Sequence, residues 1–198
     1  MAFNSSTSFK LVALLGLTCL AAPASANLLV NGSFEDVFGS DWTITGNGGR
    51  SNGAGLNFVA TDGAWGCNFN GGDREPNAVL FQTFATTVGN EYDLSFDFGK
   101  WYFGGGVAAL QVEVLSGATT VLDQTVSDET GAVGSDIWSS FQFHFVATDT
   151  TTTLRFTDRS NATNGFDGFL DNVSVVPAPS SGLAFSLVLV GAARRRHR

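Results

Sequence analysis

Few side chains of this sequence have the types and spacing that catalysis requires. His144 is the single histidine between residues 27 and 176, and it lies on a predicted strand as an ordinary surface residue would. Asp93 and Asp97 share a face of a predicted strand, but four residues along a strand span ~13 Å, beyond the roughly 5–9.5 Å between the carboxylates of a glycoside hydrolase. We therefore expect no enzyme; a glycan hydrolase with carboxylates from different strands is the less favoured alternative.

Aromatic side chains are the best candidates for binding a ligand. Trp42, Trp65, Trp101, Tyr102 and Trp138 lie at predicted strand ends or in loops, rather than in mid-strand. Sugars stack their apolar faces on such rings, and neighbouring Asp or Asn side chains bind the hydroxyls. We predict that Trp42, Trp65, Trp101 and Tyr102 bind ligand; the alternative is that each tryptophan closes one end of a hydrophobic core.

The elements that would position these side chains are strands, because hydrophobic residues recur with a period of two. This alternation is clearest in Tyr92–Phe98, Leu110–Val114, Phe141–Phe145 and Leu154–Phe156. Further strands are predicted at Leu28–Val30, Ser33–Val37, Trp42–Thr45, Asn57–Thr61, Val79–Phe84, Thr120–Val126 and Phe169–Val176. Many short antiparallel strands, with 18 Phe in the whole chain to fill an interior, predict an all-β, antiparallel two-sheet sandwich.

The stretch Gly46–Gly72 interrupts this pattern, because nine of its residues are glycine. We expect long loops there, around the single strand Asn57–Thr61. Long loops at one end of a sandwich often carry binding function. The alternative is a surface insertion without a role in binding.

The ends of the sequence have the composition of targeting signals. Lys10, the apolar run LVALLGLTCLAA and then Ala24-Ser25-Ala26 form the layout of a secretory signal peptide, which we expect to be cleaved after Ala26. At the other end, an apolar run from Gly182 to Ala193 precedes four arginines, as in a segment that a membrane holds with its cations on the cytoplasmic side. The sequence thus divides into a signal peptide (1–26), one domain (27–176) and a hydrophobic sorting tail (177–198).

Charge and cysteine content limit the partners of the domain. Residues 27–176 hold 18 acidic and five basic residues, a formal charge of −13, which disfavours nucleic acid as a partner. Such a surface is compatible with cations, above all Ca²⁺. Cys67 is the single cysteine of this domain, so it has no intrachain disulfide partner there.

Two parts of the sequence resemble known families. The tail VPAPSSGLAFSLVLVGAARRRHR resembles the C-terminal tails of PEP-CTERM proteins, which exosortases process in Gram-negative bacteria. The opening NLLVNGSFE (Asn27–Glu35) and the closing GFDGFLDNVSVV (Gly165–Val176) resemble choice-of-anchor C family domains, as do Val79–Gly99 and Phe143–Asp158. The resemblance implies a galactose-binding-like jelly roll, similar in shape to many carbohydrate-binding modules.

The same resemblance implies a structural Ca²⁺ ion. In jelly-roll binding modules an acid of the first strand and one of the last often share this ion, and the matching positions are Glu35 and Asp171. The parity of Asp171 with Val173 and Val175 predicts that it points inward, where a buried carboxylate needs a partner. Backbone carbonyls would complete six to eight oxygens. The alternative is that Asp171 caps a turn by accepting backbone N–H groups.

These features predict an exported, non-catalytic protein of the Gram-negative cell envelope, outer surface or extracellular matrix. Adhesion or carbohydrate binding is the leading function, with extracellular polysaccharide as the partner. An exosortase-type sorting enzyme and transient membrane insertion through the tail are also expected. A purely structural matrix component without a small ligand is the main alternative.

Overall fold

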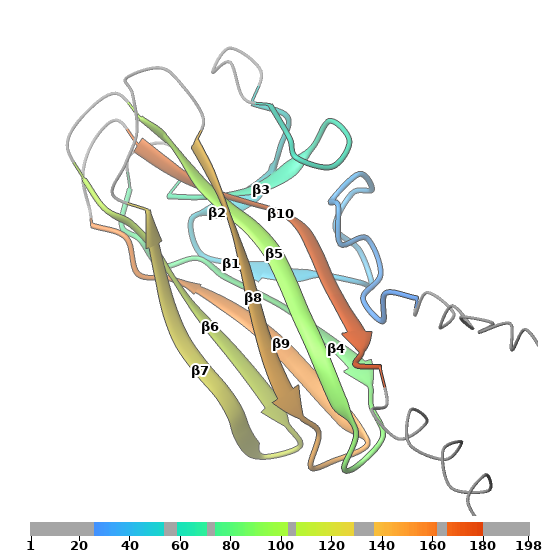
Figure 1. Ribbon diagram of the computed structural model, residues 1–198. Coiled ribbons are helices and arrows are strands. Elements are labelled where there is room, and N and C mark those ends of the chain that lie inside the picture. The colour runs from blue at the N-terminus through green and yellow to red at the C-terminus, as the bar shows by residue number, and fades with distance from the viewer. Residues whose placement is uncertain are drawn as a thin grey trace, which may run out of the picture.

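The fold is an all-β sandwich of two five-stranded antiparallel sheets (Figure 1). The computed structural model describes residues 26–53, 59–70, 74–102, 106–128, 137–161 and 166–179. The predicted signal peptide and nearly all of the predicted sorting tail lie outside these residues. Within them there is no helix long and apolar enough to cross a membrane. The predicted fold class is confirmed.

Each sheet combines strands from distant parts of the chain. Sheet A has the order β1-β4-β9-β6-β7 and sheet B the order β2-β3-β10-β5-β8. The strands are β1 (Thr43–Thr45), β2 (Gly48–Ser51), β3 (Gly66–Phe69), β4 (Val79–Ala85), β5 (Glu91–Tyr102), β6 (Ala108–Ser116), β7 (Thr119–Asp128), β8 (Ile137–Val146), β9 (Thr151–Asp158) and β10 (Phe166–Pro177). Each sheet therefore has one short edge strand and one long edge strand.

The core lies between the sheets and follows the predicted alternation. Phe96 is 1% exposed, and its ring centroid lies 5.4 Å from that of Phe141 in the same sheet and 5.2 Å from that of Phe156 in the opposite sheet. Phe143 also faces inward, with its ring centroid 6.1 Å from that of Phe96, and is partly buried on β8, an edge strand of sheet B. Interior aromatic contact of this kind stabilises the sandwich without any special sequence motif.

The predicted strands Leu28–Val30 and Ser33–Val37 are wrong. Residues 28–37 form an irregular segment that lies against β10, with hydrogen bonds from Leu28 N to Val175 O and from Val173 N to the carbonyl of Gly32. A Cβ atom at Gly32 would lie 2.0 Å from Val173 O, so the close approach requires glycine. Leu29 and Phe34 of this segment are buried in the core, although the segment joins neither sheet.

The prediction for Gly46–Gly72 is also wrong. The stretch contains β2 and β3, whereas the described part of the predicted strand Asn57–Thr61 is not a strand. A Cβ at Gly48 would lie 2.9 Å from Ile44 Cδ1 and 3.0 Å from Asn68 O. At this position glycine allows strands to pack closely instead of forming a loop.

Candidate functional site

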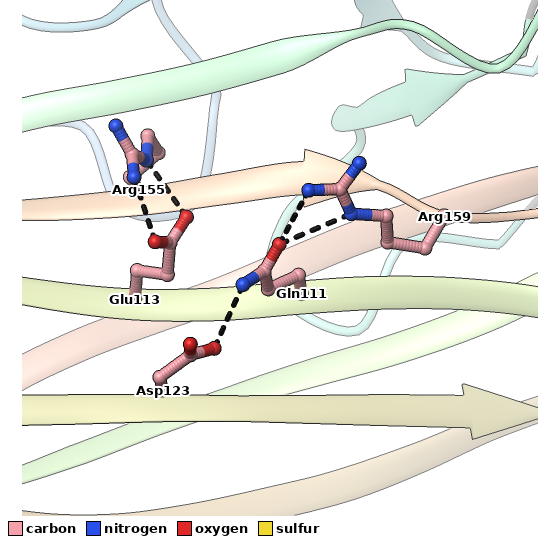
Figure 2. Close-up of polar contacts among 5 residues, drawn as sticks. All are labelled: Gln111, Glu113, Asp123, Arg155 and Arg159. Carbon is pink, nitrogen blue, oxygen red and sulfur yellow. Dashed lines mark hydrogen bonds and ion pairs between the residues drawn. The ribbon is translucent and has the colours of Figure 1, made fainter.

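Five polar side chains form two neighbouring hydrogen-bonded groups, together called the network here, on the outer face of sheet A (Figure 2). Arg155 binds Glu113 through two bonds, Nε to Oε2 at 2.8 Å and Nη2 to Oε1 at 2.7 Å. Arg159 donates from Nε and Nη2 to Gln111 Oε1 at 3.0 and 2.7 Å. Gln111 in turn donates from Nε2 to Asp123 Oδ1 at 2.8 Å. Three neighbouring strands and the residue after β9 are thus joined by planar side chains.

Strand alternation places this network on the outside. Gln111 and Glu113 alternate along β6 with Leu110, Val112 and Val114, each of which is fully buried. The register sets Glu113 opposite residue 155 of β9 and residue 123 of β7, so their side chains lie on one face. Each of these strands is predictable from its alternating sequence, but the pairing between strands is not, and so the network was not predicted.

An aromatic ring lies on the same face. Phe81 of β4 is directly opposite Arg155 in register and is half-buried. Two residues further along β4, Thr83 and Thr153 share a hydrogen bond between their Oγ1 atoms of 2.8 Å. A partly exposed ring on the same face as fixed guanidinium, amide and hydroxyl groups can stack on a sugar while these groups bind its hydroxyls.

The charges of this face are balanced and held in place. The hydrogen bond with Glu113 raises the pKa of Arg155, more strongly than burial lowers it. Arg159 and Asp123 are exposed, while the Arg155 side chain is 38% and the Glu113 side chain 12% exposed. Ion pairs this near solvent contribute about 0–1 kcal/mol to stability, so their main effect is to fix the orientation of the groups.

The predicted ligand-binding tryptophans have different environments. Trp42 is 1% exposed, its centroid lies 5.5 Å from that of Phe34, and its Nε1 donates to Asn31 O at 2.9 Å. Its assignment to ligand binding is therefore wrong, since no ring face is open, and it closes the core as the alternative held. Trp65 is half-buried, with Arg50 Cζ 3.5 Å from its ring centroid.

The other two predicted aromatic residues end strand β5. Trp101 is paired with Asp167 and Tyr102 with Phe166 of β10. The side chains of Trp101 and Tyr102 are outside the part of the chain that the structure describes. Trp138 lies on β8 opposite Gly99, two residues before Trp101, and donates from Nε1 to Val59 O at 2.9 Å. Its indole N–H is thus used within the protein.

The second predicted site, at Asp171, lies on the outer face of sheet B. The parity argument that placed Asp171 inward is wrong, because the β5–β10 register shifts after it and Asn172 takes a left-handed φ of 52°. A β-bulge reverses the alternation. Leu170 joins the core and Val173 does so again beyond the bulge, whereas Asp171 lies opposite Asp97, on the outside.

Asp171 is nevertheless fully buried, because residues 61–65, here named the covering segment, lie over it. Its Oδ2 accepts from Thr61 N at 2.8 Å, Thr61 Oγ1 at 3.2 Å and Asp62 N at 2.9 Å, and its Oδ1 accepts from Asn172 N at 2.7 Å. Burial raises the pKa of Asp171, although these hydrogen bonds act in the opposite direction. The carboxylate has the turn-capping contacts that sequence analysis gave as the alternative.

Glu35 holds the other end of the covering segment. Its Oε1 accepts from Ala64 N at 2.7 Å and from Trp65 N at 2.8 Å. Gly63 lies between the residues that bind Asp171 and those that bind Glu35. It has a φ of 84°, and a Cβ there would lie 2.4 Å from Glu35 Oε1. The two predicted calcium ligands thus bind the two ends of one backbone segment directly.

Asp97 and Asp171 lie opposite each other on the neighbouring strands β5 and β10, but they are not an accessible pair of carboxylates. Asp97 is only 7% exposed and accepts from Ser140 Oγ at 2.5 Å and from Asn172 Nδ2 at 3.1 Å. Its hydrogen bonds and those of Asp171 engage both oxygens of each acid. His144 is paired with Asp93 at 2.6 Å and is 80% exposed, which fits an ordinary surface residue.

Residues Gly49–Gly53 have the sequence pattern G-x-S-x-G. A nucleophile elbow places its serine on a strained turn between a strand and a helix. Ser51 instead ends β2, and its Oγ accepts from Gly53 N at 3.0 Å. It lies on the opposite edge of sheet B from β8, which carries His144, so the motif does not form a triad with that histidine.

The comparisons with known proteins concern the fold. No protein-family model and no curated protein matches the chain. The carbohydrate-binding module TmCBM61, solved with β-1,4-galactotriose, is 20% identical with a TM-score of 0.55, over 77% of this chain and 99% of that one. The K1 cleaved adhesin domain of Lys-gingipain from Porphyromonas gingivalis W83 is 16% identical with a TM-score of 0.52, over 72% and 94%. A xylan-binding domain from CBM 22 is 13% identical with a TM-score of 0.51, over 77% and 96%. The chain therefore has the jelly-roll sandwich fold that these proteins share.

Proposed function

We propose that this protein is an exported, non-catalytic carbohydrate-binding protein of the cell surface or extracellular matrix. The observation that carries the proposal is the hydrogen-bonded network around Gln111 on the exposed face of sheet A. The fold similarity supports it as a likeness of shape alone. The sorting tail and signal peptide predicted from sequence support export.

The network suits polysaccharide because it is already ordered before ligand binds. Sugar hydroxyls are donors and acceptors at once, and planar amide, carboxylate and guanidinium groups bind them in fixed directions. Gln111 is held from both ends, by Arg159 at Oε1 and by Asp123 at Nε2. An ordered side chain loses little conformational entropy on binding, which otherwise costs about 0.5–1.5 kcal/mol per side chain. Phe81 supplies the apolar contact.

The substrate class is tested with a panel of soluble polysaccharides. Galactan and xylan come first, because one similar module was solved with β-1,4-galactotriose and another is named a xylan-binding domain. Affinity electrophoresis of the domain in gels with each polysaccharide should show retardation by at least one of them, with no release of reducing sugar. If no polysaccharide retards the domain, the structural matrix component is the better account. Reducing sugar released in proportion to enzyme would support a hydrolase.

A matched pair of variants locates the site. Phe81→Ala removes the ring on sheet A, and Trp65→Ala removes the half-buried ring beside Arg50. We propose that Phe81→Ala weakens binding about tenfold or more, as loss of a stacked ring does. Trp65, with Trp101 and Tyr102, is a second set of contacts predicted from sequence. A loss confined to Trp65→Ala would move the site to that set.

Export and sorting are proposed from the sequence. The exported protein should lack residues 1–26 and should be trimmed near Pro177 and Pro179 by an exosortase-type enzyme after transient membrane insertion. Intact mass of the protein recovered outside the cell measures both ends together. A recovered species that still ends at Arg198 would contradict the sorting step while leaving carbohydrate binding untouched.

A further inference from the structure

A positive charge, that of Arg50, lies beside the backbone of Glu35, one of the two residues to which the resemblance assigns calcium. Arg50 extends from β2, and its Nε donates to Phe34 O at 2.6 Å while its Nη2 donates to Glu35 O. Its Cζ lies 3.5 Å from the ring centroid of Trp65, the last residue of the covering segment. One guanidinium group thus contacts the irregular N-terminal segment and the covering segment together.

We propose that Arg50 takes the place of a structural metal ion, and that the contacts among residues 34–35, the covering segment and β10 form without calcium. A guanidinium group is planar, carries five N–H donors and stacks on aromatic faces, so it can bind two carbonyls and an indole together. A metal ion could hold the carbonyls but could not stack on the ring.

The oxygen donors of the site do not fit a calcium cage. Ca²⁺ takes six to eight oxygen ligands. Four hydrogen bonds engage the two oxygens of Asp171, and Glu35 Oε1 accepts two backbone N–H groups. The carbonyls of Phe34 and Glu35 both accept from Arg50. Within the described residues, no three His, Cys, Asp or Glu side chains gather in a way that could hold a metal.

Local backbone geometry brings these groups into direct contact. Phe34 has a left-handed φ of 57°, and its own N–H donates to Asn31 O at 3.1 Å, which turns the Phe34 carbonyl toward Arg50. On the other side, a Cβ at Gly63 would lie 2.4 Å from Glu35 Oε1, so the covering segment packs against that carboxylate itself. The acid meets backbone directly, and no intervening ion is needed to satisfy its charge.

The first test uses the full mature domain with unchanged sequence. After purification with chelator and dialysis, the protein is measured for bound calcium and for melting temperature in millimolar CaCl2 and in excess EDTA. We expect substoichiometric calcium and the same melting temperature in both solutions. Stoichiometric calcium, or a melting temperature that rises with CaCl2 and falls with EDTA, would overturn the proposal, because an ion that binds the native state alone must stabilise it.

The second test changes the arginine. Arg50→Ala should lower the melting temperature by several degrees, whereas Arg74→Ala, at an exposed arginine outside this contact, should leave it nearly unchanged. Arg50→Lys should recover only part of the loss, since an ammonium group cannot match the planar donors. Equal melting temperatures for Arg50→Ala and the unchanged protein would overturn the proposal. If Arg50→Ala does not fold, Arg50→Lys and the calcium measurement still decide it.

Discussion

Polar residues alternate with buried ones along the strands of both sheets, but the outward polar residues of the two sheets have different environments. On sheet A the outward polar residues, such as Gln111 and Arg159, meet solvent and bind one another. Around the β-bulge of sheet B the outward acids Asp97 and Asp171 are 7% and 0% exposed. The covering segment lies over Asp171, and Asp97 accepts hydrogen bonds from Ser140 and Asn172. An outward polar residue on a period-two strand is thus available to a ligand on this part of sheet A and is part of the internal structure beside the covering segment.

The largest loss of stability should come from replacing Asp171, the acid beneath the covering segment. Asp171→Ala leaves the backbone N–H groups of Thr61, Asp62 and Asn172 without their acceptor. Each unmet buried donor costs about 1–3 kcal/mol, so we expect the free energy of unfolding to fall by roughly 3 kcal/mol or more in urea titration. Asp123→Ala on sheet A is the control and should change it by less than about 0.5 kcal/mol. Similar values for the two variants would erase the contrast between the faces.

Two glycines test how the covering segment packs on Glu35. Gly63 and Gly89 have nearly the same φ, 84° and 83°, but a Cβ at Gly63 meets Glu35 Oε1 at 2.4 Å while a Cβ at Gly89 meets nothing within 4 Å. Both Ala variants incur backbone strain of about 1–2 kcal/mol. We expect Gly63→Ala to lose at least about 1 kcal/mol more than Gly89→Ala in the same unfolding assay. An equal loss would mean that the segment does not pack on Glu35 as described.

The inner side of sheet A gives a smaller, pH-dependent effect. Asp158 is 1% exposed, burial raises its pKa above 3.8, and its Oδ2 has no hydrogen-bond partner among the described residues. A raised acid pKa means that the folded state favours the protonated form, so stability that is present below pH 3.8 is lost as pH rises through the folded pKa. The stability of Asp158→Asn relative to the unchanged protein should therefore increase as pH rises from acidic to neutral, which urea titration at both pH values measures. A difference in the free energy of unfolding between the two proteins that does not change with pH would contradict this account.

Some of this architecture is predictable from the sequence because it is local. The alternation of Tyr92, Leu94 and Phe96 fixes the inner side of β5, and the same argument gave β4 and β6 to β10 with shifted ends. A period of two requires no knowledge of partners, only of burial. The sandwich class follows from the number and length of such strands.

The rest depends on contacts between distant residues. The Thr61–Asp171 hydrogen bond joins residues 110 apart, and the bulge that turns Asp171 outward shows itself in the sequence only as an Asn that can adopt a left-handed φ. Tryptophan is common both in sugar-binding sites and in hydrophobic cores, so the residue type alone does not predict that Trp42 is buried. The network around Gln111 required the register of β6 with its two neighbours.

The most direct test of the sheet A site is the affinity of one glutamine variant against another. Gln111→Ala removes the partner of both Arg159 and Asp123, while Gln142→Ala removes an exposed glutamine from the outer face of sheet B. Isothermal titration with a polysaccharide that binds the unchanged domain should show about tenfold weaker binding for Gln111→Ala, roughly 1.4 kcal/mol, and unchanged binding for Gln142→Ala. Unchanged affinity for Gln111→Ala, or a loss with Gln142→Ala instead, would contradict the assignment of carbohydrate binding to sheet A.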